Sequence, residues 1–204
     1  MLIRKEETDN IIWGVWKIEE DISDFLSMLS DKSFTMNISS DKRLREQAAV
    51  RVLLKALLNG EEKSISYSAN GKPYLSDGSY VISISHTKGY AAVILSKQGR
   101  TGIDIEYLSE KVKRVQSKFI SDKEYIDKSN ETIHLLLHWC AKETMYKALG
   151  YTGVDLMHHL FVEKFIPERN STFKGYEKYT GGSIYFDIHY YVENDYVLTM
   201  TYEN

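Results

Sequence analysis

Residues 101–106 read TGIDIE, and this short segment is the best starting point for the fold. Its two isoleucines alternate with Asp104 and Glu106, which predicts a β-strand with one apolar face and one acidic face. Gly102 leaves room on this strand for a close approach by another backbone or a ligand. An Asp-x-Glu pair on a strand is commonly only a half-exposed polar face, so the segment alone does not establish a site.

A second segment, residues 139–147, reads WCAKETMYK and has the composition of a helix. Glu143 and Lys147 are four residues apart, and Lys142, Tyr146 and Trp139 are expected on the same side. On its own this pattern also describes a solvated helix face with a weak surface ion pair. Read together with the acidic strand, it offers three carboxylates and two lysines, which suit a hard divalent cation and phosphate oxygens.

Around these segments the pattern alternates between helix and strand. Periodicity and turn residues predict strands over residues 11–18, 80–85, 90–95, 101–106, 184–191 and 196–202 and helices over 22–29, 41–59 and 112–149. Ser40-Asp41 and Asn59-Gly60 are start and stop signals for the second helix, and Gly150 ends the third. The order of elements predicts an α+β protein built from two similar α/β halves.

Three further groups of polar and charged residues stand out, and the strand-end group contains short donors that could hold phosphate. The segment GKPYL presents Lys72 on a stiff Gly-Pro turn, and the strand segment SISHT ends in Ser85 and His86. Arg43 and Arg51 lie on the second predicted helix. Each group also has an ordinary structural explanation as a hairpin turn, a strand end or a charged helix face. No G-x-S-x-G elbow and no P-loop occurs in the sequence.

Composition narrows the functional class. The chain has 204 residues, 43% of them hydrophobic and 12% aromatic, which suffices for a globular core. A formal net charge of −3 gives no support for nucleic-acid binding. One cysteine excludes an internal disulfide, and no segment has the apolar length of a signal peptide or a membrane span. We therefore expect a cytoplasmic protein that binds neither nucleic acid nor membranes.

Taken in order along residues 43–147, these motifs resemble those of the 4′-phosphopantetheinyl transferases. The paired segments GIDIE and WxxKExxxK are the specific part of the resemblance, and the others support it. The length is similar to that of the larger, Sfp-type branch, whose members are monomers. The resemblance implies one transferase unit over residues 1–204, with approximate halves 1–100 and 101–204 related by pseudo-twofold symmetry and the active site between them.

The resemblance also implies a reaction and a set of site residues. An enzyme of the holo-acyl-carrier-protein synthase type moves the phosphopantetheine group of coenzyme A to a serine of an apo acyl or peptidyl carrier protein, as in fatty acid biosynthesis. Mg²⁺, or Mn²⁺, would be held by Asp104, Glu106 and Glu143, with Glu143 also the best candidate base. Phosphate contacts would come from Lys72, Ser85, His86, Lys142, Lys147, Arg43 and Arg51, with Lys147 also counted as catalytic. Glu124 is a weaker candidate for assisting the base.

Two other functions remain open at this point. The first is another Mg²⁺-dependent phosphotransferase acting on a nucleotide, which would have to work without a P-loop. The second is a carrier-protein-binding module without activity, for which three retained metal ligands would serve no purpose. The sequence does not say which carrier protein, fatty-acid, polyketide or nonribosomal-peptide, would be the partner.

Overall fold

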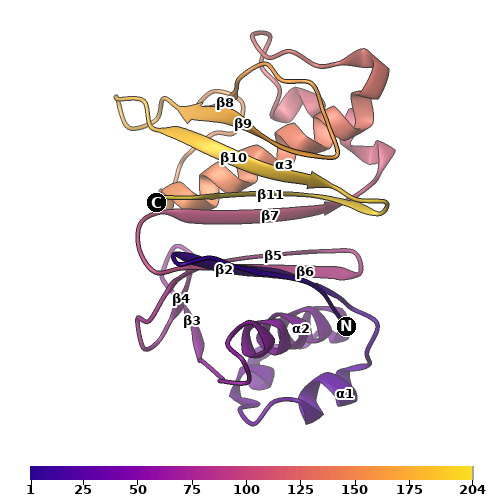
Figure 1. Ribbon diagram of the computed structural model, residues 1–204, viewed down its shortest axis with the longest axis vertical. Helices are drawn as coiled ribbons and strands as arrows, with labels where there is room; N and C mark the ends of the chain where they lie inside the picture. The colour runs from indigo at the N-terminus through magenta and orange to yellow at the C-terminus, as the bar shows by residue number, and fades with distance from the viewer. Residues whose placement is uncertain (204) are drawn as a thin grey trace. The chain divides into compact units, whose positions relative to one another are not determined.

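The computed structural model describes residues 1–203, and the chain divides into two compact units, Met1–Lys97 (unit 1) and Gln98–Asn204 (unit 2). Each unit combines an antiparallel sheet with one long helix that packs against it (Figure 1). The protein is therefore a mixed α/β structure with few helices, consistent with the fold that the resemblance implies. None of the helices within residues 1–203 combines the length and apolar composition that a bilayer crossing requires.

Unit 1 contains a four-stranded sheet with the order β1-β2-β6-β5. Its elements are β1 (Leu2–Glu7), β2 (Ile11–Lys17), α1 (Ile22–Ser27), the 3₁₀ turn η1 (Ser33–Asn37), α2 (Asp41–Leu57), β3 (Ile65–Tyr67), β4 (Pro73–Leu75), β5 (Val81–Thr87) and β6 (Tyr90–Ser96). The predicted start of α2 is confirmed, since the Ser40 side chain accepts a hydrogen bond from the backbone N–H of Arg43. The predicted stop is confirmed too, because Asn59 and Gly60 both adopt positive φ.

The core of unit 1 lies between α2 and this sheet. Leu53, Leu54 and Leu57 of α2 are almost fully buried, as are Val93 and Leu95 of β6. Strand β1 lies at the edge of this sheet and pairs with β2. The sequence does not predict it, because LIRKEE is mostly charged and lacks apolar alternation. Pairing with β2, rather than its own side chains, makes it a strand.

Unit 2 contains a five-stranded sheet with the order β7-β11-β10-β9-β8. Its elements are β7 (Thr101–Tyr107), α3 (Glu131–Leu149), β8 (Leu160–Val162), β9 (Asn170–Glu177), β10 (Tyr185–Val192) and β11 (Tyr196–Tyr202). Leu137, Cys140 and Met145 of α3 are fully buried against this sheet. Gly150 ends α3 in the left-handed conformation with φ of 68°, as its position predicts.

The predicted helix over residues 112–149 is wrong in its first half. Residues 110–130 form three short 3₁₀ turns, η2 (Glu110–Arg114), η3 (Gln116–Lys118) and η4 (Lys128–Asn130), and only α3 is a regular helix. The side chains of Ser109 and Asp127 accept hydrogen bonds from backbone N–H groups two residues further on. Such local bonds compete with helical ones and break the segment into turns.

Candidate active site

The candidate site in unit 2 depends on an unusually close approach of α3 to β7. A Cβ atom at Gly102 would lie 2.2 Å from the backbone carbonyl oxygen of Thr144, a distance that no side chain tolerates. This confirms the expectation that Gly102 admits a second backbone. The missing side chain allows α3 to pack directly on β7, next to the acidic face of the strand.

Asp104 and Lys147 form the central ion pair of this region. Lys147 Nζ lies 2.7 Å from Asp104 Oδ1 and also donates to the carbonyl oxygen of Ile103 at 3.0 Å. Asp104 is buried, whereas the Lys147 side chain is 26% exposed. Strand alternation places Asp104 on the α3 face while Ile103 and Ile105 are buried on the opposite face, as the spacing predicts.

Glu143 carries the clearest electrostatic signal in the site. Burial, followed by the negative charges of Asp104 and Glu106, raises the pKa of Glu143 to about 7, and Lys147 offsets only part of this effect. The pKa of a carboxyl group rises this far when burial removes water from its ionised form and nearby positive charge does not offset that loss. Asp104, Glu106 and Glu143 thus come together with Lys147 at the junction of β7 and α3.

Glu106 is held by an aromatic side chain of α3. The indole Nε1 of Trp139 donates a hydrogen bond of 3.0 Å to Glu106 Oε1. Trp139 lies one helical turn before Glu143, so both side chains face β7. The structure therefore brings together four residues expected at the site, Asp104, Glu106, Glu143 and Lys147, and adds the indole of Trp139.

The donor set of this site fits a hard divalent cation. Asp104, Glu106 and Glu143 provide only oxygen atoms, the ligands preferred by Mg²⁺ and Mn²⁺. The pKa of Glu143 is raised mainly by burial and further by the two neighbouring carboxylates, whose repulsion a bound cation would relieve. Within residues 1–203, no group of three or more His, Cys, Asp or Glu side chains is already arranged to hold a metal ion. The three carboxylates would therefore have to adjust on binding.

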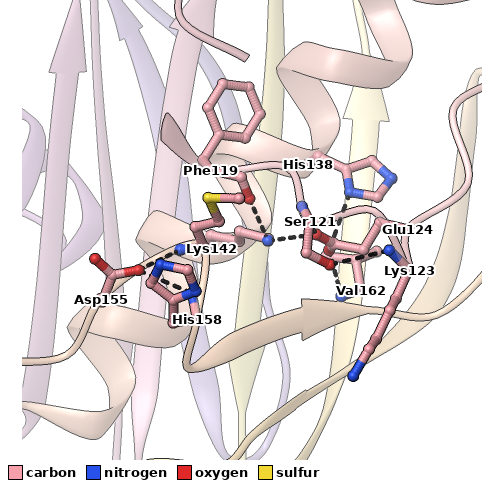
Figure 2. Close-up of polar contacts among 10 residues, drawn as sticks. Phe119, Ser121, Lys123, Glu124, His138, Lys142, Asp155, His158 and Val162 are labelled. Atoms are coloured by element: carbon pink, nitrogen blue, oxygen red, sulfur yellow. Dashed lines mark hydrogen bonds and ion pairs between the residues drawn. The ribbon is translucent and has the colours of Figure 1, made fainter. Parts of the chain in front are cut away.

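Lys142 and Glu124 do not belong to this group. Both side chains are buried on another side of α3, where Lys142 Nζ lies 2.7 Å from Glu124 Oε2 and also donates to the carbonyl oxygen of Phe119 (Figure 2). We expected Lys142 beside Glu143 and facing phosphate. Consecutive helix residues diverge by about 100°, and the segment 119–124 covers the side on which Lys142 lies.

Glu124 is saturated by contacts within unit 2. Its carboxylate accepts backbone N–H groups of Ser121 at 3.0 Å and Val162 at 2.9 Å, and His138 Nδ1 lies 3.5 Å from Oε1. Burial alone would raise the pKa of Glu124, but His138 and Lys142 more than offset it, so this pKa lies below its usual range. In this structure the Glu124 carboxylate therefore serves as an acceptor for groups of unit 2.

The candidate phosphate-binding residues of unit 1 lie on three elements. Lys72 follows Gly71, whose φ of 81° confirms the predicted turn between β3 and β4. Ser85 is buried and His86 is exposed on β5, because successive strand residues point to opposite faces. The expected Ser-His-Thr cluster is therefore split, and His86 Nδ1 instead lies 3.5 Å from Glu46 Oε2 of α2.

The two arginines of α2 differ in their surroundings. Arg43 is exposed in the first turn of the helix, where its backbone N–H donates to the Ser40 side chain. Arg51 is half-buried, lies 4.0 Å from the ring centroid of Phe34, and donates from Nη1 to the backbone and side-chain oxygens of Gln47. Arg51 is thus packed within unit 1 rather than standing on a solvated helix face.

Comparison with known proteins agrees with the chemistry of unit 2. The family model of the 4′-phosphopantetheinyl transferase superfamily matches residues 100–201, half of the chain and nearly all of unit 2. The chain belongs to the 4′-phosphopantetheinyl transferase superfamily. It is therefore a transferase of this kind, and the matched region contains Asp104, Glu106, Glu143 and Lys147. No curated protein matches the chain.

Some residues around the candidate site were not predicted from the sequence. Trp139 stands out as part of the WxxKE motif, but its hydrogen bond to Glu106 could not be read from spacing. Phe119 contacts Trp139, and His138 contacts Glu124. In the sequence the first is only an apolar residue and the second only a polar residue of a segment predicted as helical. Their roles depend on contacts between segments far apart in the chain.

Proposed function

We propose that this transferase moves the 4′-phosphopantetheine group of coenzyme A to a serine hydroxyl of an apo acyl or peptidyl carrier protein. The observation that carries the proposal is the group formed by Asp104, Glu106, Glu143 and Lys147 inside the region matched by the family model. Three carboxylates beside a lysine are suited to a metal-bound pyrophosphate. A superfamily match without these residues would support the fold but not the reaction.

Asp104, Glu106 and Glu143 would hold Mg²⁺ or Mn²⁺, which when bound neutralises charge on the pyrophosphate oxygens. The Lys147 ammonium, already beside Asp104, would contact a phosphate oxygen as a point charge. The Glu143 carboxylate would accept the serine proton, directly or through a water molecule.

The bonds that change are simple to account for. The serine Oγ forms a bond to the phosphorus that carries the pantetheine arm, and the bridging P–O bond of the pyrophosphate breaks. The electron pair of that bond leaves with adenosine 3′,5′-bisphosphate. The serine proton goes to Glu143, and holo carrier protein is the second product.

We assign the nucleotide phosphates to residues of unit 1. Lys72 and His86 are the main candidates because each is presented by a defined turn or strand end, with Ser85, Arg43 and Arg51 as supporting contacts. Lys142 and Glu124 are left out of this assignment, since they are buried against each other. We also propose a monomeric, cytoplasmic enzyme of the Sfp-type branch, whose motifs the sequence resembles.

A direct assay tests the proposal. The full chain is incubated with coenzyme A, Mg²⁺ and a panel of apo carrier proteins of the fatty-acid, polyketide and nonribosomal-peptide classes, and each carrier is weighed by mass spectrometry. We expect one carrier class to gain a single phosphopantetheine group, and Asp104→Ala to abolish this gain. If no carrier gains mass, the proposal is wrong.

The same assay discriminates the two other functions. An inactive carrier-binding module would bind an apo carrier without changing its mass, which a parallel binding measurement would detect. Another nucleotide phosphotransferase would consume coenzyme A or a nucleotide in the absence of carrier. The complete carboxylate group is the observation that disfavours an inactive module.

A further inference from the structure

The Glu106 carboxylate is connected to a buried part of unit 2 by two aromatic rings. Trp139 donates its indole N–H to Glu106 Oε1 at 3.0 Å. The ring of Phe119 packs edge-on against Trp139, with centroids 5.2 Å apart and an interplanar angle of 73°. Phe119 is fully buried, so it leaves the indole little room to rotate on this side.

Phe119 is in turn anchored through its backbone. Its carbonyl oxygen accepts a hydrogen bond from Lys142, whose ammonium also pairs with Glu124. Glu124 accepts the backbone N–H groups of Ser121 and Val162, so one carboxylate ties the segment 119–124 to both α3 and β8 (Figure 2). The anchor is buried, and breaking one partner of a buried ion pair is strongly unfavourable.

We propose that Trp139 and Phe119 are positioning residues for Glu106, and that the buried Lys142–Glu124 pair holds them in place. The inference rests on the proposed function, in which Glu106 is a metal ligand. An indole is a donor only, so it fixes one carboxylate oxygen in one orientation. Hydrogen bonds of this kind orient metal ligands, and their loss commonly weakens metal affinity by roughly 10–100-fold.

The proposal also explains why Lys142 is buried beside a site made of charged groups. Lys142 and Glu143 are neighbours in sequence, but their side chains lie on different sides of α3. Lys142 secures the segment that carries Phe119, while Glu143 faces Asp104 and Glu106. Lys142 and Glu124 thus contribute through packing rather than through contact with phosphate.

The test compares Trp139→Phe with a matched variant, Trp16→Phe. Trp16 in unit 1 also donates its indole N–H to a carboxylate, Glu20 Oε2 at 3.1 Å, and that carboxylate is far along the chain from Glu106. Both variants keep an aromatic ring and lose one indole–carboxylate bond. Binding of Mn²⁺ is measured on the full-length protein by electron paramagnetic resonance of the free ion, together with the Mg²⁺ dependence of transfer.

We expect Trp139→Phe to weaken Mn²⁺ binding about 10-fold or more and to raise the Mg²⁺ concentration for half-maximal transfer by a similar factor. The kcat at saturating Mg²⁺ should largely recover, a split that simple loss of folded protein would not produce. Trp16→Phe should change neither quantity. Phe119→Leu, which keeps an apolar side chain at this position, should give a smaller shift in the same direction.

Several results would overturn the inference. Wild-type Mn²⁺ affinity in Trp139→Phe, an equal loss in Trp16→Phe, or Mn²⁺ binding that survives in Glu106→Gln would each do so. If Trp139→Phe does not fold, Phe119→Leu decides alone, and unchanged Mn²⁺ binding in it overturns the inference. The metal readout needs no carrier protein, so weakened binding in Trp139→Phe would support the inference even if no carrier were modified and the proposed function were wrong.

Discussion

Glu143 is the residue at which the proposed function and the stability of the fold oppose each other. Its pKa is raised to about 7 by burial and by Asp104 and Glu106, so above that pH the folded protein carries a charge that its surroundings disfavour. In metal-free buffer at pH 8 we expect Glu143→Gln to raise the free energy of unfolding by roughly 1–3 kcal/mol. Thermal unfolding in the presence of a chelator measures this.

Glu7→Gln is the matched control for that change, because Glu7 is exposed on the edge strand β1. We expect it to leave the melting temperature nearly unchanged. Added Mg²⁺ should stabilise the wild type more than Glu143→Gln, since the variant has lost one proposed ligand. A variant less stable than wild type at pH 8 would show that Glu143 has a favourable partner in the metal-free protein.

His134 gives the second prediction at the residue scale. It is buried, its Nδ1 accepts the backbone N–H of Asp127 at 2.7 Å, and burial together with the charge of His138 lowers its pKa from 6.5 to about 4. The unfolded chain binds this proton more readily. Stability present above pH 6.5 is therefore lost as the pH falls toward 4, by on the order of 3 kcal/mol.

Urea unfolding between pH 4 and 7 checks this behaviour. His134→Asn keeps an acceptor near the position of Nδ1 but cannot titrate, so its stability should depend less steeply on pH over this range. The exposed His158 provides the control variant His158→Asn, which should keep the wild-type slope. Identical slopes in wild type and His134→Asn would assign the acid sensitivity to other groups.

At the scale of elements, the contact between β7 and α3 depends on Gly102. A methyl group there would meet the Thr144 carbonyl oxygen at 2.2 Å and the backbone nitrogen of Ala148 at 3.2 Å, and both are backbone atoms that cannot turn aside. We expect Gly102→Ala to lower the free energy of unfolding by about 1–3 kcal/mol, the usual cost of overpacking. It should also weaken Mn²⁺ binding, because Asp104 moves relative to Glu143.

Gly182→Ala is the control for Gly102→Ala, since a Cβ at Gly182 has no atom within 4 Å and its φ is not in the left-handed region. Chemical unfolding and Mn²⁺ titration should show no loss for this variant. If Gly102→Ala had wild-type stability and metal affinity, the close helix–strand contact would be unimportant for the site.

At the scale of the whole molecule, the family match covers unit 2, whereas the proposed nucleotide contacts belong to unit 1. The two units should therefore affect different kinetic constants. Lys72→Ala and His86→Ala should raise the KM for coenzyme A more than they lower kcat, because they hold parts of the nucleotide that do not react. Asp104→Ala should instead abolish turnover.

Steady-state kinetics with coenzyme A and dephospho-coenzyme A measure this division. Lys88→Ala, an exposed lysine in the turn after β5, is a control that should leave both constants unchanged. Equal use of the two substrates by the wild type would argue against a role for His86 at the 3′-phosphate. A fall in kcat without a change in KM in Lys72→Ala would argue that unit 1 contributes to the chemical step.

Much of the local structure was predictable because it depends on neighbours along the chain. Alternation in TGIDIE placed Asp104 and Glu106 on one face, and Ser40 and Gly150 marked a helix start and a helix end. The four-residue spacing of Glu143 and Lys147 put them on one side of α3. Residues 110–130 were mispredicted because the side chains of Ser109 and Asp127 form local hydrogen bonds that compete with helical ones.

What the sequence determined by itself is the family chemistry: the acidic strand, the helix with Glu143 and Lys147, and the glycine that lets them meet. Only the tertiary structure decided that Lys142 is buried with Glu124 and that Trp139 holds Glu106. The physical reason is that periodicity gives the direction of a side chain from its own helix or strand. Whether that side chain is then buried depends on segments distant in the chain, here residues 119–124 and β8. The positions of those segments follow from packing.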